Sequence, residues 1–145
     1  MSQQPDEEHT PPEGVEAATV EAVGRLTEAL ETVERARGHL YSFHQLTGTA
    51  DFQIGDAVDQ LREAGHGDLA DQLTKEIVGR NVIPGHWTFQ IMEAYDDTYW
   101  SVLREAERRV REELTGGRRH LYEASLKEDR RTHGHPDHTA RPRSS

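Results

Sequence analysis

Apolar residues recur at intervals of three and four along most of this chain, which is the spacing that places side chains on one face of an α-helix. The first such segment, 14–47, contains no proline. Its regularly spaced apolar residues are Val23, Leu26, Leu30, Val33 and Leu40. We therefore predict one long helix over this segment, ended by Gly48.

The same spacing continues beyond Gly48. It predicts helices over 51–64, 67–79, 86–115 and 118–128, with a proline-containing turn over 81–85. Asp51 is expected to cap the first of these helices, and the Gly116–Gly117 pair is expected to stop the second long helix. Alternation of apolar and polar residues over a useful length is absent from the sequence. We therefore predict an all-α protein.

The two long helices are expected to form an antiparallel bundle, because the two short helices between them can fold up and back and return the chain near its start. The apolar seams then align residue by residue. The predicted pairs are Val23–Val110, Leu26–Ala106, Leu30–Leu103, Val33–Tyr99 and Leu40–Met92. An apolar seam alone fixes such a register only to within seven residues. One charged pair decides it, since the same register sets Arg37 opposite Asp96 and His44 opposite Phe89.

Arg37 and Asp96 interrupt the two seams and are predicted to form a buried structural pair. Such a pair is costly to desolvate, so its plainest use is to fix helix register and orientation. Tyr41, His44, Glu93 and Asp97 would lie within one or two turns of it. These four residues form the candidate polar pocket.

A metal site is the alternative interpretation of these polar residues. His44, His86, Glu93 and Asp97 offer nitrogen and oxygen donors suited to one divalent ion such as Zn²⁺, Mn²⁺ or Fe²⁺. Acidic residues on long helices are usually only solvated. The internal Glu-x-x-His segment, Glu63 to His66, places its histidine after a helix-stopping glycine and so departs from the ferritin-like pattern.

Composition divides the chain into a core and two tails. All 27 Leu, Ile, Val and Phe residues lie within 15–129, which is therefore the expected helical bundle domain. The acidic segment 1–14 and the basic, histidine-containing segment 130–145 are expected to be disordered tails, because neither has apolar surface to offset the entropy of ordering. These tails could attract one another, although salt screens such contacts between exposed charges.

Charge and motifs exclude several classes of function. The net charge of −10 disfavours nucleic-acid and acidic-membrane binding. There are no cysteines, no apolar run long enough for a membrane span, no nucleophile elbow and no phosphate-binding loop. A cytoplasmic location is the default expectation. No motif matches a protein family with useful specificity.

Two clusters of charged or metal-binding residues have plain interpretations. The arginines between 104 and 119 are interleaved with Glu105, Glu107, Glu112 and Glu113, which favours a salt-bridged, solvated face. The tract of His133, His135 and His138 resembles a small chelating segment, and such segments usually bind metal adventitiously.

The sequence favours a non-enzymatic helical bundle that acts by association, as a homodimer. The reason is that the segment 15–33 extends past the reach of the short helices, so its apolar side has only one partner within the chain and a second chain would complete its burial. The alternative is a metal-binding or small oxidoreductase-like bundle with its His and carboxylate site between the long helices. Whether the protein is an enzyme is left open.

Overall fold

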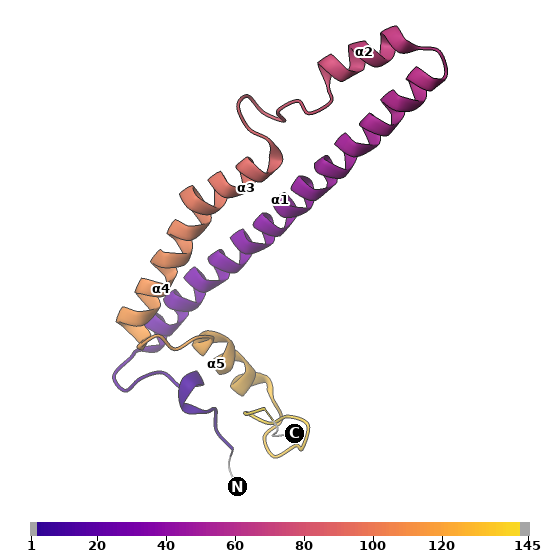
Figure 1. Cartoon of the computed structure of the whole chain (residues 1–145). Coiled ribbons are helices and arrows are strands. Elements are labelled where there is room, and N and C mark those ends of the chain that lie inside the picture. The colour runs from indigo at the N-terminus through magenta and orange to yellow at the C-terminus, as the bar shows by residue number, and fades with distance from the viewer. Residues whose placement is uncertain (1–2, 143–145) are drawn as a thin grey trace. The chain divides into compact units, whose positions relative to one another are not determined.

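The structure is a computed structural model that describes residues 3–142. In chain order its elements are the 3₁₀ turn η1 (Glu7–His9), α1 (Ala17–Glu63), α2 (Gly67–Glu76), α3 (Thr88–Tyr95), the π-helical turn η2 (Asp96–Trp100), α4 (Ser101–Thr115) and α5 (Leu121–Arg130) (Figure 1). Residues 3–142 contain no β-strand, only an isolated bridge between Ile83 and His86. The all-α prediction is confirmed. None of the helices in this range is long and apolar enough to cross a membrane.

The first long helix is longer than predicted. It passes through Gly48 and Gly55 without a break, so the predicted end at Gly48 and the separate helix over 51–64 are wrong. A glycine inside a helix costs only about 1 kcal/mol relative to alanine, and the helical spacing of apolar residues resumes directly after Gly48. The helix ends before Gly65, whose φ of 93° lies in the left-handed region. Only α2 therefore lies between the two long helical segments, and it falls within the predicted range 67–79.

The second long helix is present from Thr88 to Thr115, but it contains the π-helical turn η2. There the Ser101 amide donates to the Asp96 carbonyl, five residues back. A π turn inserts one extra residue into the helix and rotates the face that follows it. After this turn Leu114 is 46% exposed, whereas Thr115 is fully buried.

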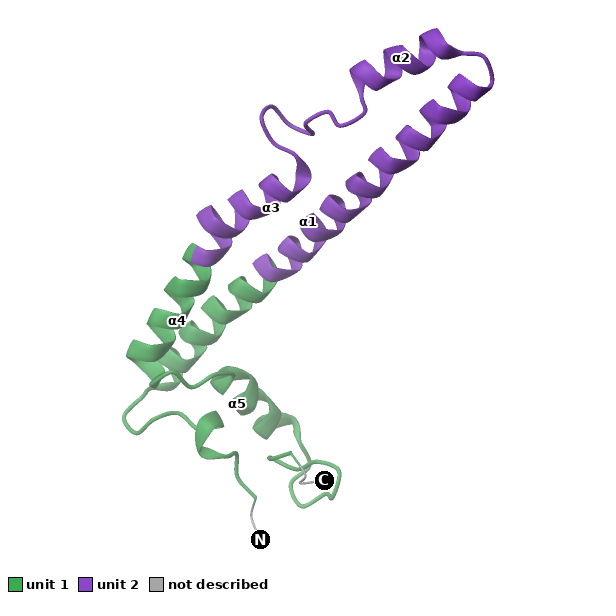
Figure 2. Ribbon diagram, viewed as in Figure 1, with its two compact units in different colours: residues 1–32, 102–145 green, residues 33–101 purple. Residues whose placement is uncertain are grey.

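The chain divides into two compact units (Figure 2). Unit 1 comprises residues 1–32 and 102–145, and unit 2 comprises residues 33–101. The buried apolar side chains of unit 1 are Val20, Val23, Leu30 and Leu121, and those of unit 2 are Val58, Ala70 and Met92. The core of unit 1 includes Val20 and Val23 from the start of α1, and Tyr122 of α5 packs against Gly24 beside them. The expectation that this part of α1 lacks a second partner within the chain is therefore wrong, because α5 covers it.

The two terminal segments contact one another within unit 1. The Arg131 guanidinium donates to the Gln3 carbonyl at 2.7 Å, and the Arg141 guanidinium donates to the Gln4 carbonyl at 2.8 Å. Arg118 donates to the Thr10 carbonyl at 2.7 Å. The described parts of the two tails are thus joined by arginines that bind backbone oxygens, while their disorder in solution stays a prediction. Residues 1–2 and 143–145 lie outside the described range.

Candidate functional site

Arg37 of α1 and Asp96 of η2 are in contact, as the sequence predicts for this pair. The Arg37 Nε and Nη2 atoms donate to the two carboxylate oxygens of Asp96 at 2.6 and 2.9 Å. The guanidinium also stacks on Trp100, 4.5 Å from the ring centre. The two side chains are 30% and 25% exposed, so the pair is half-buried rather than buried.

This contact shifts the ionisation of both groups. The hydrogen bonds from Arg37 hold the pKa of the Asp96 carboxyl below its usual range, and this effect outweighs the desolvation that acts in the opposite direction. The same hydrogen bonds raise the pKa of Arg37. Both shifts favour the charged forms, so the pair is ionised at neutral pH.

The lowered pKa of Asp96 makes a pH-dependent contribution to stability. A carboxyl whose pKa is lower in the folded chain stabilises the fold above its unfolded pKa of about 3.9, and this contribution is lost as the pH falls through the folded value. We expect Asp96→Asn to unfold a few degrees below the wild type at neutral pH and this difference to shrink below about pH 4. Thermal unfolding of both proteins across this range measures it. A difference that does not change with pH would show that the charge on Asp96 contributes nothing.

Of the other predicted pocket residues, Tyr41 lies close enough to Arg37 to contribute to the rise of its pKa, whereas His44 contacts Thr88. The Nδ1 atom of His44 lies 2.7 Å from the Thr88 hydroxyl, rather than opposite Phe89, which is 47% exposed. Tyr41 contacts His44 edge-on, with ring centres 5.9 Å apart. Glu93 and Asp97 are exposed.

The four predicted metal ligands do not form a site in the described chain. The Nδ1 atom of His86 lies 3.0 Å from the Pro84 carbonyl oxygen, and His44 contacts Thr88. Within residues 3–142, the group able to hold a metal ion consists of other residues, on unit 1. The set of His44, His86, Glu93 and Asp97 is therefore not brought together.

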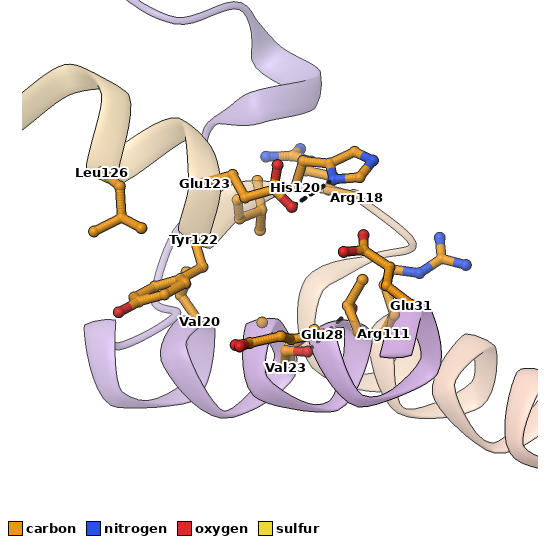
Figure 3. A pocket seen from close by; sticks show the side chains of 13 residues that line it. Val20, Val23, Glu28, Glu31, Arg111, Arg118, His120, Tyr122, Glu123 and Leu126 are labelled. Carbon is orange, nitrogen blue, oxygen red and sulfur yellow. Dashed lines mark hydrogen bonds and ion pairs between the residues drawn. The ribbon is translucent and has the colours of Figure 1, made fainter. Parts of the chain in front are cut away.

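A pocket of about 160 Å³ lies in unit 1 between α1 and α5 (Figure 3). Its apolar wall comprises Val20, Val23, Leu121 and Leu126. Its polar rim comprises Glu28, Glu31, Arg111, Arg118, His120 and Glu123. The pocket thus combines an apolar wall with a charged rim, as ligand sites commonly do.

Two features of the backbone build this pocket. Gly24 lets α5 approach α1 closely, because a Cβ atom at this position would lie only 2.6 Å from the Cβ of Tyr122. His120, directly before α5, has a φ of 59°, and among the described residues other than glycine no other has a positive φ. This left-handed residue turns the chain between the glycine pair and α5.

Three residues on the rim of this pocket bring metal-binding atoms together. Glu31 from α1, His120 and Glu123 each offer one such atom, and these atoms all lie within 4.8 Å of one another. The Nδ1 atom of His120 is 3.1 Å from a carboxylate oxygen of Glu123. In Figure 3 the carboxylate of Glu31 points from α1 toward these two side chains.

Beside the pocket, unit 1 buries a carboxylate that the sequence interpretation placed on a solvated face. Glu107 is 5% exposed and accepts hydrogen bonds from the Thr27 hydroxyl at 2.9 Å and from Arg111 Nε at 3.0 Å. Arg111 in turn donates to the Gly117 carbonyl at 2.7 Å. No single residue type in the sequence signals this burial.

The rest of the arginine-rich face agrees with its prediction. Arg108 forms ion pairs with Glu105 and with Glu112, and all three side chains are about half-exposed. These pairs raise the pKa of Arg108 and lower that of Glu105. This part of α4 is therefore the salt-bridged, solvated face that the sequence indicates.

The histidines of the C-terminal tract are held by the backbone. The Nδ1 atoms of His138 and His135 accept hydrogen bonds from the amides of Thr132 and Asp137, at 3.0 and 3.1 Å. The Nε2 atom of His133 lies 3.1 Å from the Glu128 carbonyl oxygen. These contacts occupy one nitrogen of each ring, so joint metal binding by the three histidines would require the segment to rearrange.

Comparison with known proteins adds no family. A scan against models of protein families, a search of curated proteins and a search of solved structures each found no match to this chain.

Proposed function

We propose that this protein acts by association with a second copy of itself, without catalysing a reaction, and that unit 2 supplies the contact surface. The proposal retains the antiparallel bundle of two long helices expected from the sequence. One observation carries it: unit 2 exposes nine large apolar side chains.

Nine large apolar residues of unit 2 are exposed. They are Tyr41, Phe43, Leu46, Phe52, Leu69, Ile77, Ile83, Phe89 and Tyr99. Leu46 and Phe52, both on α1, have the largest exposed fractions in this set, at 68% and 80%. By contrast, Val58, Ala70 and Met92 are the buried apolar residues among those described in unit 2.

Nine exposed large apolar side chains in one unit are more than isolated surface residues would account for. Single apolar residues on a surface are normal, whereas large exposed apolar areas mark interaction surfaces. Burying one leucine or phenylalanine side chain stabilises an assembly by about 1.5 to 3 kcal/mol. Burial of several would offset the entropic cost of association, which is on the order of 4 to 15 kcal/mol.

A second copy is the partner that supplies a matching surface. In a two-fold dimer the same patch lies on both chains, so an apolar surface meets an apolar surface. Unit 2 carries 11 acidic and 5 basic residues. Two copies therefore repel one another at long range, and added salt should strengthen their association by screening this repulsion. A basic protein partner would show the opposite dependence on salt.

Photo-crosslinking tests which surface meets the second copy. We expect p-benzoylphenylalanine in place of Phe52 to give a chain-to-chain crosslink whose yield rises with salt. The matched control is the same residue in place of Val102, which is 62% exposed but belongs to unit 1. Crosslinking at 102 alone, or at neither position, would contradict the proposal.

A further inference from the structure

We propose that Glu31, His120 and Glu123 bind one Zn²⁺ ion at the rim of the pocket between α1 and α5. The site belongs to unit 1 and is independent of the proposed association through unit 2. It differs from the metal site predicted from the sequence in every ligand.

The spacing of the donor atoms suits a zinc ion. Zinc binds histidine nitrogen and carboxylate oxygen at about 2.0 to 2.2 Å in a tetrahedral arrangement, which sets neighbouring donors about 3.4 Å apart. The Nδ1 atom of His120 and the nearer oxygen of Glu123 are already 3.1 Å apart. The Glu31 donor lies within 4.8 Å of both, so its exposed carboxylate needs to move by only about 1 to 1.5 Å.

The chemistry of this donor set also favours zinc over magnesium or calcium. An imidazole nitrogen suits zinc, whereas magnesium and calcium prefer sets of oxygen donors and higher coordination numbers. Three protein donors leave a fourth position for water.

The backbone holds the start of α5, which carries two of the three donors, against α1. His120 and Glu123 are fixed relative to α1 because Leu121, between them, is 5% exposed and packs at the start of α5. The close contact of Tyr122 with Gly24 fixes the same end of α5. Figure 3 shows the Glu31 carboxylate approaching the other two donors from α1, on the opposite side of the pocket rim.

The two arginines on the rim do not oppose a cation strongly, because each already has acceptors. Arg111 donates to Glu107 and to the Gly117 carbonyl. Arg118 donates to the Thr10 carbonyl and lies 3.5 Å from a carboxylate oxygen of Glu7.

Zinc at this position would link α1 directly to the start of α5. Because the folded chain brings the three donors together, binding of the ion should stabilise unit 1 against unfolding. It should also weaken at acidic pH, because protons compete with the ion for the imidazole nitrogen.

Calorimetric titration with ZnCl₂ and with MgCl₂ tests the proposal. The titrated reference protein is the tag-free, full-length chain with His133→Asn, His135→Asn and His138→Asn, which remove the chelating tract. We expect it to bind one Zn²⁺ per chain, to unfold at a higher temperature with zinc, and to show no comparable response to magnesium. Absence of stoichiometric zinc binding in this protein would overturn the proposal.

Two further variants, made in the reference protein, separate the site from the surrounding pocket. His120→Asn removes the imidazole while keeping a residue that tolerates the left-handed backbone, and it should weaken zinc binding at least about tenfold. Glu28→Gln, a change on the same rim outside the group of three, should leave binding unchanged. Equal effects of the two variants would overturn the proposal. Circular dichroism of both variants checks that the helices are intact.

Discussion

Replacing Leu46 and Phe52 together by glutamate should convert the proposed dimer into a monomer. Each substitution removes an apolar side chain that the proposed interface buries, at a cost of about 1.5 to 3 kcal/mol, and places a charge in its position. The combined loss should weaken dimerisation at least about 100-fold. Sedimentation equilibrium should therefore give a mass near 16.5 kDa for the variant.

Val102→Glu is the control for this result. Val102 is 62% exposed, like Leu46, but it belongs to unit 1, so its substitution should leave the dimer intact. Both positions lie on helix surfaces, so neither substitution should unfold the chain. If Val102→Glu dissociates the dimer as strongly as the double variant, the interface does not lie on unit 2.

Gly24→Ala should destabilise the protein even though alanine is the better helix former. A Cβ at position 24 would lie 2.6 Å from the Tyr122 Cβ and 3.0 Å from its Cγ, and these atoms cannot move unless α5 moves. Overpacking of this kind costs about 1 to 3 kcal/mol and outweighs the helix-propensity gain of about 1 kcal/mol. Denaturant unfolding measures the change in the free energy of unfolding.

Gly38→Ala is the matched control, because this glycine lies on the same helix. A Cβ at position 38 would have no neighbour within 4 Å, so only the propensity gain remains. We expect the free energy of unfolding to rise by about 0.5 to 1 kcal/mol. If both alanine variants are stabilised, α5 does not pack on α1 at Gly24.

The all-helical class and most helix positions could be predicted because the spacing of apolar residues reflects burial on one face. The end at Gly48 could not. A glycine is only a weak local signal, and the continuing helical pattern after it decides the outcome. At Gly65 the backbone adopts a left-handed conformation, and there the helix does end.

The contact of Arg37 with Asp96 could be predicted because Asp96 lies at the start of the π turn, before its extra residue shifts the register. The turn rotates the helix that follows it, and Glu107, which the sequence predicts on a solvated face, is buried. Aligning two apolar seams assumes that each helix keeps a regular period of 3.6 residues. No local sequence feature predicts the extra residue that the π turn inserts.

That Glu31, His120 and Glu123 lie together could not be predicted from the sequence, for a different reason. The predicted last helix began at 118 and so placed His120 inside it, whereas the structure places this residue before α5 in the left-handed region. Glu31 joins the group only because α5 packs on α1. That packing depends on the close approach at Gly24, which the spacing of apolar residues does not encode.

Sedimentation equilibrium of the wild-type chain at micromolar concentration, at low and at raised salt, tests the central claim most directly. The proposed association predicts a mass near twice 16.5 kDa, with the dimer strengthened by salt because two acidic units come together. A single species of 16.5 kDa under both conditions would contradict it.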